Sequence, residues 1–246
     1  MIGEVIMVTY KKFSDKGTRE INEDSVGLIE KGSQICCVLC DGLGGHGRGE
    51  EASQYVVHDM LNCFEASDNP IECMDNMFER AQTGLLEEQK KKSAKFEMKT
   101  TATMLIINDK YVRWGHIGDS RVYLFKKGKY KKRTFDHSVP QMLVLAKDIK
   151  EKEIRNHPDR NKLLRVMGIE WGASSYDISK KVKRKAGMSF LLCSDGFWEL
   201  IDEKQMQETL KASSNASEWV KAMVEIVREN GQGKNMDNFS AIAVML

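Results

Sequence analysis

Apolar residues follow two different periods along this chain of 246 residues. Short runs rich in Val, Ile, Leu or Cys, bounded by polar or glycine-containing breaks, are typical of β-strands. The predicted strands cover residues 4–10, 24–30, 34–40, 100–107, 111–117, 121–126, 129–135, 176–184, 188–193 and 239–246. Apolar residues that recur at three- and four-residue steps predict amphipathic helices instead. These helices cover residues 50–65, 71–92, 202–211 and 217–229.

The order of the elements indicates the fold class. Strands come in blocks interrupted by helix pairs, which favours antiparallel sheets with helices outside over a doubly wound parallel sheet. Turn signals at Asn108-Asp109 and Lys127-Gly128 predict an antiparallel meander over 100–135. After Asp136 the pattern becomes polar and irregular to about residue 168, which indicates short helical pieces on the surface. We therefore expect an α+β protein that forms a single domain over residues 1–246.

Composition narrows the possible functions. Hydrophobic residues make up 41% and charged residues 30%, as in an ordinary folded protein with a core. The net charge is only +2, so the basic runs 90–92 and 131–133 are interpreted as solvated faces, and no nucleic-acid partner is expected. No segment approaches the roughly 20 apolar residues that span a bilayer, and residues 1–10 lack a signal-peptide pattern. We expect a cytoplasmic protein without a membrane partner.

The six cysteines favour structural thiols. Three of them lie in the apolar run 35–40, which predicts buried thiols in a reducing compartment. Cys37 and Cys40 form one C-x-x-C pair, but a structural zinc site needs a second pair of ligands, and the sequence contains none at matching spacing. Cysteine phosphatases need an arginine after five intervening residues, and no cysteine here meets that spacing.

Four aspartates carry the strongest chemical signal, since each stands where an apolar strand meets glycine or small polar residues. They are Asp41, Asp119, Asp195 and Asp237. A single such aspartate is typical of a turn, but four carboxylates at one sheet edge would repel one another unless hard cations neutralised them. In a two-metal site about 3.5–4 Å across, a bridging water becomes a nucleophile at neutral pH. The pattern therefore predicts phosphate-ester hydrolysis.

Such chemistry also needs a fixed cation that binds phosphate oxygens. Arginine suits this role because its planar fork makes two hydrogen bonds at once. Arg19, four residues before Glu23-Asp24 on a polar segment between strands, is the candidate. The alternative for Arg19 is an ordinary surface arginine.

Six short motifs together suggest a family. They are Arg19-Glu20-Ile21-Asn22-Glu23-Asp24, Asp41-Gly42-Leu43-Gly44-Gly45-His46, Gly118-Asp119-Ser120-Arg121, Asp136-His137-Ser138, Leu192-Cys193-Ser194-Asp195-Gly196 and Asp237-Asn238. Their order and spacing, over residues 19 to 246, resemble the metal-dependent Ser/Thr protein phosphatases of type 2C. Residues 157–168 also resemble the segment that bacterial stand-alone members carry after their flap.

The resemblance implies a metal-ligand set. By position, Asp41 would bridge both cations and the Gly42 carbonyl would help bind one of them. Asp195 and Asp237 would hold the other cation, and Asp119 would help bind a third, weaker one. The implied cofactors are two divalent cations, Mn²⁺ or Mg²⁺.

The remaining implied roles concern the substrate and the proton. Arg19 would grip the substrate phosphate, and Glu23 would act on a metal through water. Many eukaryotic members have histidine directly after the first Asp-Gly, where this chain has Leu43. His46, three positions on, matches bacterial members as a candidate acid. A lone histidine in a glycine-rich turn is more often structural, however, and a metal-bound water can supply the proton.

The resemblance also implies the architecture and the reaction. The fold would be a four-layer α-β-β-α sandwich, two antiparallel sheets flanked by helix pairs, with a flap within about 138–168. The reaction would be hydrolysis of phosphoserine and phosphothreonine by direct attack of water activated at a two-metal centre. The partners would be phosphorylated proteins and a cognate cytosolic Ser/Thr kinase system.

Two alternatives belong to other functional classes. A pseudophosphatase would keep the fold as a binding or regulatory module, and its mark would be loss of the metal aspartates, which are all present. A nucleic-acid-binding sandwich would use the basic stretches 126–133 and 180–185, and its affinity would fall steeply with salt. The alternating pattern there suits one solvated sheet face equally well.

Overall fold

Two antiparallel β-sheets form the centre of the molecule. The computed structural model describes residues 8–43, 47–172 and 175–246. One sheet has the order β1-β11-β10-β6-β7, and the other has the order β2-β3-β4-β5-β8, with β9 also paired to β5. The strands are β1 (Thr9–Asp15), β2 (Asp24–Lys31), β3 (Gln34–Asp41), β4 (Ala102–Ile107), β5 (Tyr111–Ile117), β6 (Arg121–Lys126), β7 (Lys129–Arg133), β8 (Asp177–Ile178), β9 (Val182–Lys183), β10 (Met188–Cys193) and β11 (Phe239–Met245).

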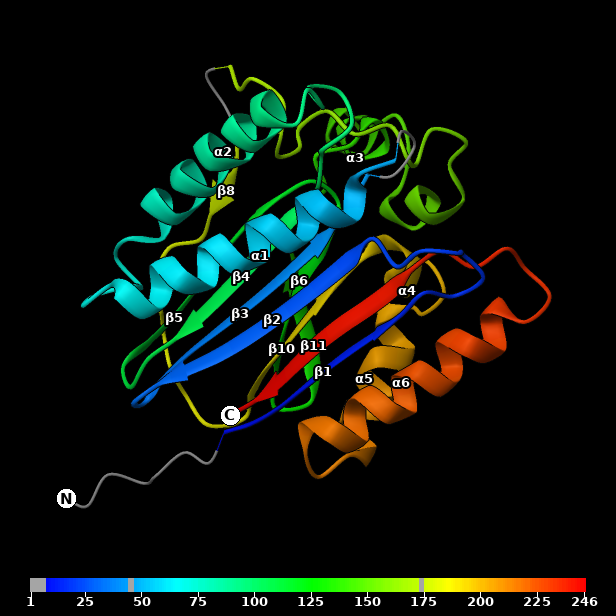
Figure 1. Ribbon diagram of the computed structural model, residues 1–246. Helices are drawn as coiled ribbons and strands as arrows, with labels where there is room; N and C mark the ends of the chain where they lie inside the picture. The colour runs from blue at the N-terminus through cyan, green and yellow to red at the C-terminus, as the bar shows by residue number, and fades with distance from the viewer. Residues whose placement is uncertain (1–7, 44–46, 173–174) are drawn as a thin grey trace.

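A pair of long helices covers the outer face of each sheet. Helices α1 (Gly49–Ala66) and α2 (Met74–Lys91) cover the sheet of β2 to β5, and α5 (Glu203–Ala212) and α6 (Ala216–Gly231) cover the sheet of β1 and β11 (Figure 1). The short α4 (Asp195–Trp198) follows β10 directly. The predicted α-β-β-α sandwich is therefore confirmed.

The three layers of apolar contact follow from the sequence periods. In α1, Val56, Met60 and Phe64 recur every four residues, and all three are fully buried against the sheet. Between the sheets, alternate residues of facing strands meet, among them Leu39 and Phe190. Burial of each such side chain contributes about 1.5–3 kcal/mol, so these layers hold the sheet edges in fixed positions.

The predicted meander over 100–135 is wrong in its topology, because β5 and β6 lie in different sheets. Strands β4 and β5 pair in one sheet, β6 and β7 pair in the other, and residues 118–120 carry the chain across. At this crossing Gly118 has φ +98, and a Cβ there would lie 2.5 Å from Thr101 Cγ2. Only glycine fits this bend without strain. The crossing sets Asp119 between the two sheets.

Other differences concern element boundaries. Strand β1 runs from Thr9 to Asp15, later than predicted, and residues 4–7 of the predicted strand lie outside the described residues. Helix α2 begins at Met74. The predicted strand over 176–184 consists of the short β8 and β9. Across the described ranges, no helix has the length and apolar character that a bilayer crossing requires.

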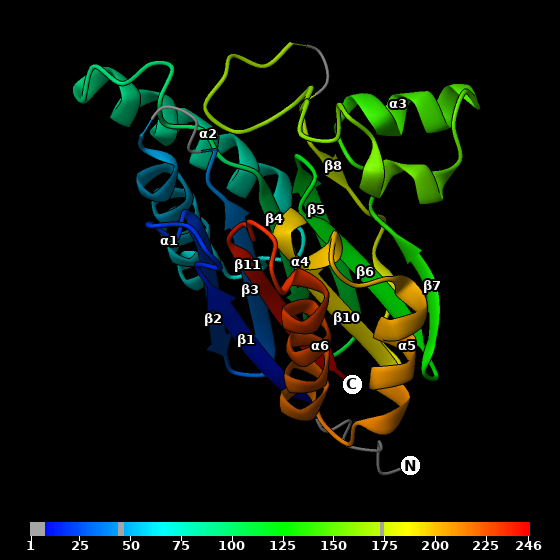
Figure 2. The ribbon, with the colours of Figure 1, turned by 90° about the vertical axis from the view of Figure 1, so that its right-hand side faces the viewer.

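The segment 138–168 lies at the end of the sheets opposite the C-terminus (Figures 1 and 2). It contains α3 (Val139–Ala146) and a 3₁₀ helix (Glu151–Asn156), which agrees with the predicted short helical pieces. Two isolated β-bridges hold this segment in place. One pairs Ser138 with Leu163 within the segment, and the other pairs Met167 with Thr100 outside it. The second bridge connects the segment to Thr100, which also pairs with Gly42.

Candidate metal centre

Four acidic residues converge at one end of the two sheets. Asp24 opens β2 and lies opposite Asp41, the last residue of β3, in the antiparallel register. Asp195 directly follows the end of β10, and Asp237 precedes β11, its antiparallel neighbour. The start of one antiparallel strand lies beside the end of the next. Each sheet therefore contributes one pair of acids.

The pKa shift of Asp41 indicates that the acids of the two sheets lie close to one another. Burial raises the pKa of Asp41 well above its usual range, and the charges of Asp195, Asp24, Asp119 and Asp237 raise it further. The other three sequence-predicted aspartates, Asp119, Asp195 and Asp237, therefore lie close enough to affect the pKa of Asp41. The structure brings together four residues that are far apart in the chain.

Asp195 and Asp119 behave in the same way. The pKa of Asp195 is raised by burial and then by Asp237, while a hydrogen bond with Asp41 opposes the shift. The pKa of Asp119 is raised well above its usual value by burial, Asp195 and Asp136, against the opposing charge of Arg121. Carboxylates that resist ionisation in the protein alone, and that offer only oxygen, fit hard divalent cations.

Asp24 is a candidate that the sequence interpretation did not include in the site. It is buried, and burial raises its pKa to about 7 although Ser240 and Ser194 donate hydrogen bonds to it. The Ser194 hydroxyl lies 2.7 Å from Asp24 Oδ2, whereas buried Oδ1 has no hydrogen-bond partner among the described residues. The signal was its place directly after Glu23 at the start of an apolar strand.

Close backbone approach explains the glycine next to Asp41. A Cβ on Gly42 would lie 2.3 Å from Gly49 O and 2.7 Å from Glu23 O, so no larger residue fits. The Gly42 N–H donates to Glu23 O at 3.1 Å, and the Asp41 N–H donates to Thr101 Oγ1 at 3.0 Å. These contacts hold the Asp41 carboxylate and the Gly42 backbone against the segment that carries Glu23.

Glu23 lies at the edge of the acidic group. Its N–H donates to Asn238 Oδ1 at 2.8 Å, which ties it to the residue after Asp237. Burial raises the pKa of Glu23, and Glu50 and Asp237 raise it further. Glu23 is thus half-buried beside Asp237, and its predicted action on a metal through water stays a prediction.

Arg19 reaches this centre from the solvent side. Its Nη2 donates to Asp237 Oδ2 at 2.9 Å, and half of its side chain is exposed. A cleft of about 490 Å³ opens beside it. The basic residues of the cleft are Arg19, Arg155, Arg160 and Lys234, and its acidic residues are Asp195, Glu199 and Asp237. An anionic ester in this cleft would meet positive charge at the rim and the acidic centre at one wall.

Comparisons with known proteins identify the family of this chain. The model of the family "Protein phosphatase 2C" matches residues 15–239. The chain belongs to the protein phosphatase 2C family. A curated relative, the serine/threonine phosphatase stp of Listeria monocytogenes serotype 4b (strain F2365), is 31% identical over 244 residues, 94% of this chain and 93% of the relative.

Solved structures of serine/threonine phosphatases have the same fold as this type 2C phosphatase. The serine/threonine phosphatase PstP/Ppp of Mycobacterium tuberculosis has a TM-score of 0.84 at 27% identity, covering 97% of this chain and 98% of that one. The catalytic domain of PstP in complex with two manganese ions has a TM-score of 0.81 at 25% identity, covering 97% of each chain. The family and fold predicted from the sequence are thereby confirmed, as is the enzyme class, a metal-dependent phosphoprotein phosphatase.

The acids of this type 2C phosphatase are spread more widely than the ligands of a compact single-ion site. Within the described ranges, three ligand atoms that all lie within 4.8 Å of one another occur only at His116, His137 and Asp177. Magnesium and manganese keep several waters, and a centre of two ions separates its carboxylates. The open arrangement of the aspartates suits such ions better than a tetrahedral site.

Two further predictions concern residues near the centre. His46 and the glycines 44–45 lie outside the described residues. Cys37 and Cys40 are buried and unpaired by disulfides, and burial raises their pKa values, so both are inert thiols of the core.

Proposed function

We propose that this phosphatase hydrolyses phosphoserine and phosphothreonine in proteins, by direct attack of water at a centre of two divalent cations, Mn²⁺ or Mg²⁺. The observation that carries the proposal is the group of buried and half-buried acids from both sheets whose charges raise one another's pKa values. A pseudophosphatase is not favoured, because it would have no need to keep this costly arrangement. The proposed substrates are phosphoproteins made by a cytoplasmic Ser/Thr kinase system.

The geometry of the two strand pairs supports the ligand set that the family resemblance implies. Asp41 faces the charges of both sheets, which suits a carboxylate shared by two cations, with the Gly42 carbonyl beside it. Asp195 and Asp237 would hold one cation from the second sheet. Asp119 would help hold a third, weaker cation, and Glu23 would act through water. When bound, the cations neutralise the carboxylates and lower the pKa of water between them.

The chain's own groups bind and orient the ester. Among the described residues the Arg19 guanidinium makes one hydrogen bond, to Asp237, and its remaining donors suit two phosphate oxygens. The same bond fixes the direction of the Arg19 side chain towards the acidic centre. His46 remains the proposed acid for the leaving alkoxide, beside a water as the other proton source.

The test is hydrolysis of p-nitrophenyl phosphate and a phosphothreonine peptide in Mn²⁺, Mg²⁺ or EDTA. Asp41→Asn should lower turnover at least about a hundredfold, the scale for loss of one preorganised charge at a transition state. The exposed Asp68→Asn, at the α1–α2 connection, is the matched control with the same charge change. Metal-dependent turnover lost only in Asp41→Asn supports the proposal. No turnover of the wild type with either cation would favour the pseudophosphatase.

Arg19 gives a separate prediction. Arg19→Ala should mainly raise KM, because it removes a contact made in the ground state as well as in the transition state. Arg19→Lys keeps the charge without the planar fork and should recover only part of the affinity. Steady-state kinetics on the phosphothreonine peptide measure both variants. An unchanged KM with a large fall in kcat would mean that Arg19 acts chiefly on the transition state.

A further inference from the structure

The loop that carries Asp119 is held on both sides by one dipeptide, Asp136-His137. Asp136 accepts two hydrogen bonds from the Arg121 guanidinium, at 2.8 and 2.6 Å. The His137 N–H donates to Gly118 O at 2.9 Å, and His137 Nδ1 accepts from the Gly118 N–H at 3.2 Å. One histidine therefore engages both backbone groups of the glycine before Asp119.

The contact with Gly118 matters because the loop bends there. Gly118 has a positive φ of +98, and its conformation sets where the Asp119 side chain points. On the other side, Trp198 Nε1 donates to Asp119 O at 3.0 Å. Within the described ranges no side chain donates a hydrogen bond to the Asp119 carboxylate, so backbone contacts of the loop direct it.

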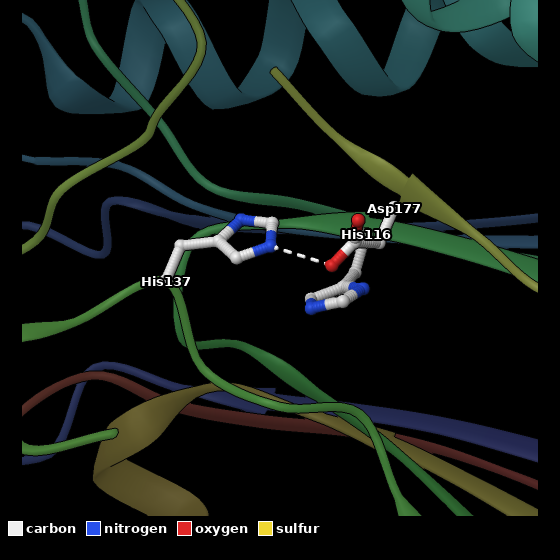
Figure 3. A group of neighbouring side chains, drawn as sticks. All are labelled: His116, His137 and Asp177. Carbon is white, nitrogen blue, oxygen red and sulfur yellow. Dashed lines mark hydrogen bonds and ion pairs between the residues drawn. The ribbon is translucent and has the colours of Figure 1, made fainter. Parts of the chain in front are cut away.

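His137 also belongs to a cluster that resembles a metal site. His116 in β5, His137 and Asp177 in β8 offer ligand atoms within 4.8 Å of one another (Figure 3). The hydrogen bonds argue against a cation there. His137 Nδ1 is an acceptor for Gly118, so the ring proton is on Nε2, which donates to Asp177 Oδ2 at 3.1 Å. A metal on Nε2 would move that proton to Nδ1, against the Gly118 N–H.

The ring geometry agrees with this exclusion. The imidazoles of His116 and His137 stack with centroids 4.6 Å apart and planes 26° apart. A metal lies in the plane of each imidazole that binds it, and two nearly parallel stacked rings do not share such a point. His116 Nε2 is already bonded to Phe135 O at 2.7 Å. The cluster orients His137; it does not bind a cation.

We propose that His137 is a positioning residue for Asp119, acting through the Gly118 amide, and that Asp177 fixes the ring tautomer this requires. In carboxylate–histidine pairs, the carboxylate binds one ring nitrogen and thereby fixes the role of the other. Here Asp177 binds Nε2 of His137, and Nδ1 orients the Gly118 amide. The inference rests on the proposed role of Asp119 as ligand of the third, weaker cation. Through His137, the 138–168 segment also reaches this loop, since the Leu164 N–H donates to His137 O at 2.7 Å.

Two substitutions separate the two ring nitrogens. In His137→Asn the side-chain oxygen takes the place of Nδ1 and accepts from Gly118, while the link to Asp177 is lost. In His137→Gln the side-chain nitrogen takes the place of Nε2 and donates to Asp177, while the acceptor for Gly118 is lost. The pair differs by one methylene, and each variant retains one of the two functions of the ring.

The main measurement is Mn²⁺ titration of the intact protein by calorimetry, with Asp119→Asn as reference. His137→Gln should weaken the weakest Mn²⁺ site about tenfold or more, the range for loss of a group that orients a ligand. His137→Asn should keep it near the wild-type affinity, and the tighter sites should stay unchanged in both. Equal weakening in the two variants, or none in His137→Gln, would overturn the proposal.

A second readout needs no metal. In the metal-free protein, the Gly118 amide should exchange with solvent faster in His137→Gln than in His137→Asn, measured by NMR hydrogen exchange. Suppose that Asp119→Asn removes the weakest Mn²⁺ site, but His137→Gln changes neither the affinity of that site nor the exchange rate of the Gly118 amide. In that case only the inference about His137 fails. If Asp119→Asn leaves every Mn²⁺ site intact, the proposed role of Asp119 fails, and with it the link from His137 to metal binding.

Discussion

Asp136 and Asp119 are both buried aspartates beside the same loop, yet their charges are handled in opposite ways. Burial alone would raise the pKa of Asp136, but Arg121 and Arg133 outweigh it, and the pKa is lowered. Arg121 in turn lies over the Trp198 ring, 3.4 Å from its centroid. At Asp119, burial and the charges of Asp195 and Asp136 outweigh the charge of Arg121 and a backbone hydrogen bond, and the pKa is raised.

The difference separates a structural acid, Asp136, from a proposed metal ligand, Asp119. Asp136 receives its cations from the protein itself, in a bidentate pair that holds β6 to the start of the 138–168 segment. Within the described residues, Asp41, Asp119 and Asp195 have no ion-pair partner, and Asp237 has only a partly exposed pair with Arg19, so most of the charge at the candidate centre is left for ions from solution to neutralise. Compensation by two buried arginines thus distinguishes Asp136 from the acids of the candidate centre.

Removal of the compensated charge should have the largest effect on stability. Asp136→Asn leaves buried Arg121 without its ion-pair partner and Arg133 with only the exposed Glu151, and loss of one partner from a buried pair costs about 3–5 kcal/mol. Urea unfolding in EDTA measures the free energy of unfolding. In the same assay Asp119→Asn should leave stability unchanged or increase it, because it removes one repelling charge. A loss of similar size in both variants would erase the proposed distinction.

Binding of Mn²⁺ should have the next largest effect on the stability of the folded protein. At a free Mn²⁺ concentration about a hundred times its dissociation constant, one site stabilises the folded protein by about 2.7 kcal/mol. This gain should disappear in Asp195→Asn and Asp237→Asn, and turnover should nearly disappear with it. Thermal unfolding with and without Mn²⁺ measures the gain. Wild-type turnover with the full Mn²⁺ gain would remove both residues from the site.

The individual elements of this fold were largely readable from the sequence. Strands β5 and β6 match their predicted ranges, 111–117 and 121–126, because short apolar runs between turn residues mark a strand locally. Their assignment to different sheets was not readable. A period of two does not encode which sheet a strand joins, and the bend at Gly118 looks like any turn between paired strands.

The same limit applies to the site. Aspartates at strand ends predicted the centre because antiparallel strands bring such ends together, and the structure groups all four. Asp24 was not assigned, since its burial depends on residues distant in the chain, such as Ser194, 170 residues away, whose hydroxyl donates to Oδ2. The role of His137 likewise depends on Gly118 and Asp177, which no local pattern connects.

His116 represents a third way to hold a titratable group inside this molecule, which is to keep it neutral. Burial lowers its pKa to about 4, with the nearby His137 adding to the shift, and its Nε2 bonds Phe135 O. Because the folded pKa lies below the unfolded value near 6.5, protons favour the unfolded chain. The contribution of His116 to stability is therefore complete above pH 6.5 and is lost as the pH falls towards 4.

The expected loss is about 1.4 kcal/mol at pH 5.5, the smallest of these effects. In His116→Gln the side-chain amide still reaches Phe135 O but does not titrate, so this loss should be absent. Urea unfolding of both proteins at pH 7.5 and pH 5.5 measures the difference between the two stabilities. The Asp136 pair remains charged over this range because its pKa is lowered, so its contribution cancels. Parallel losses in the two proteins would mean that groups other than His116, His137 among them, take up the protons.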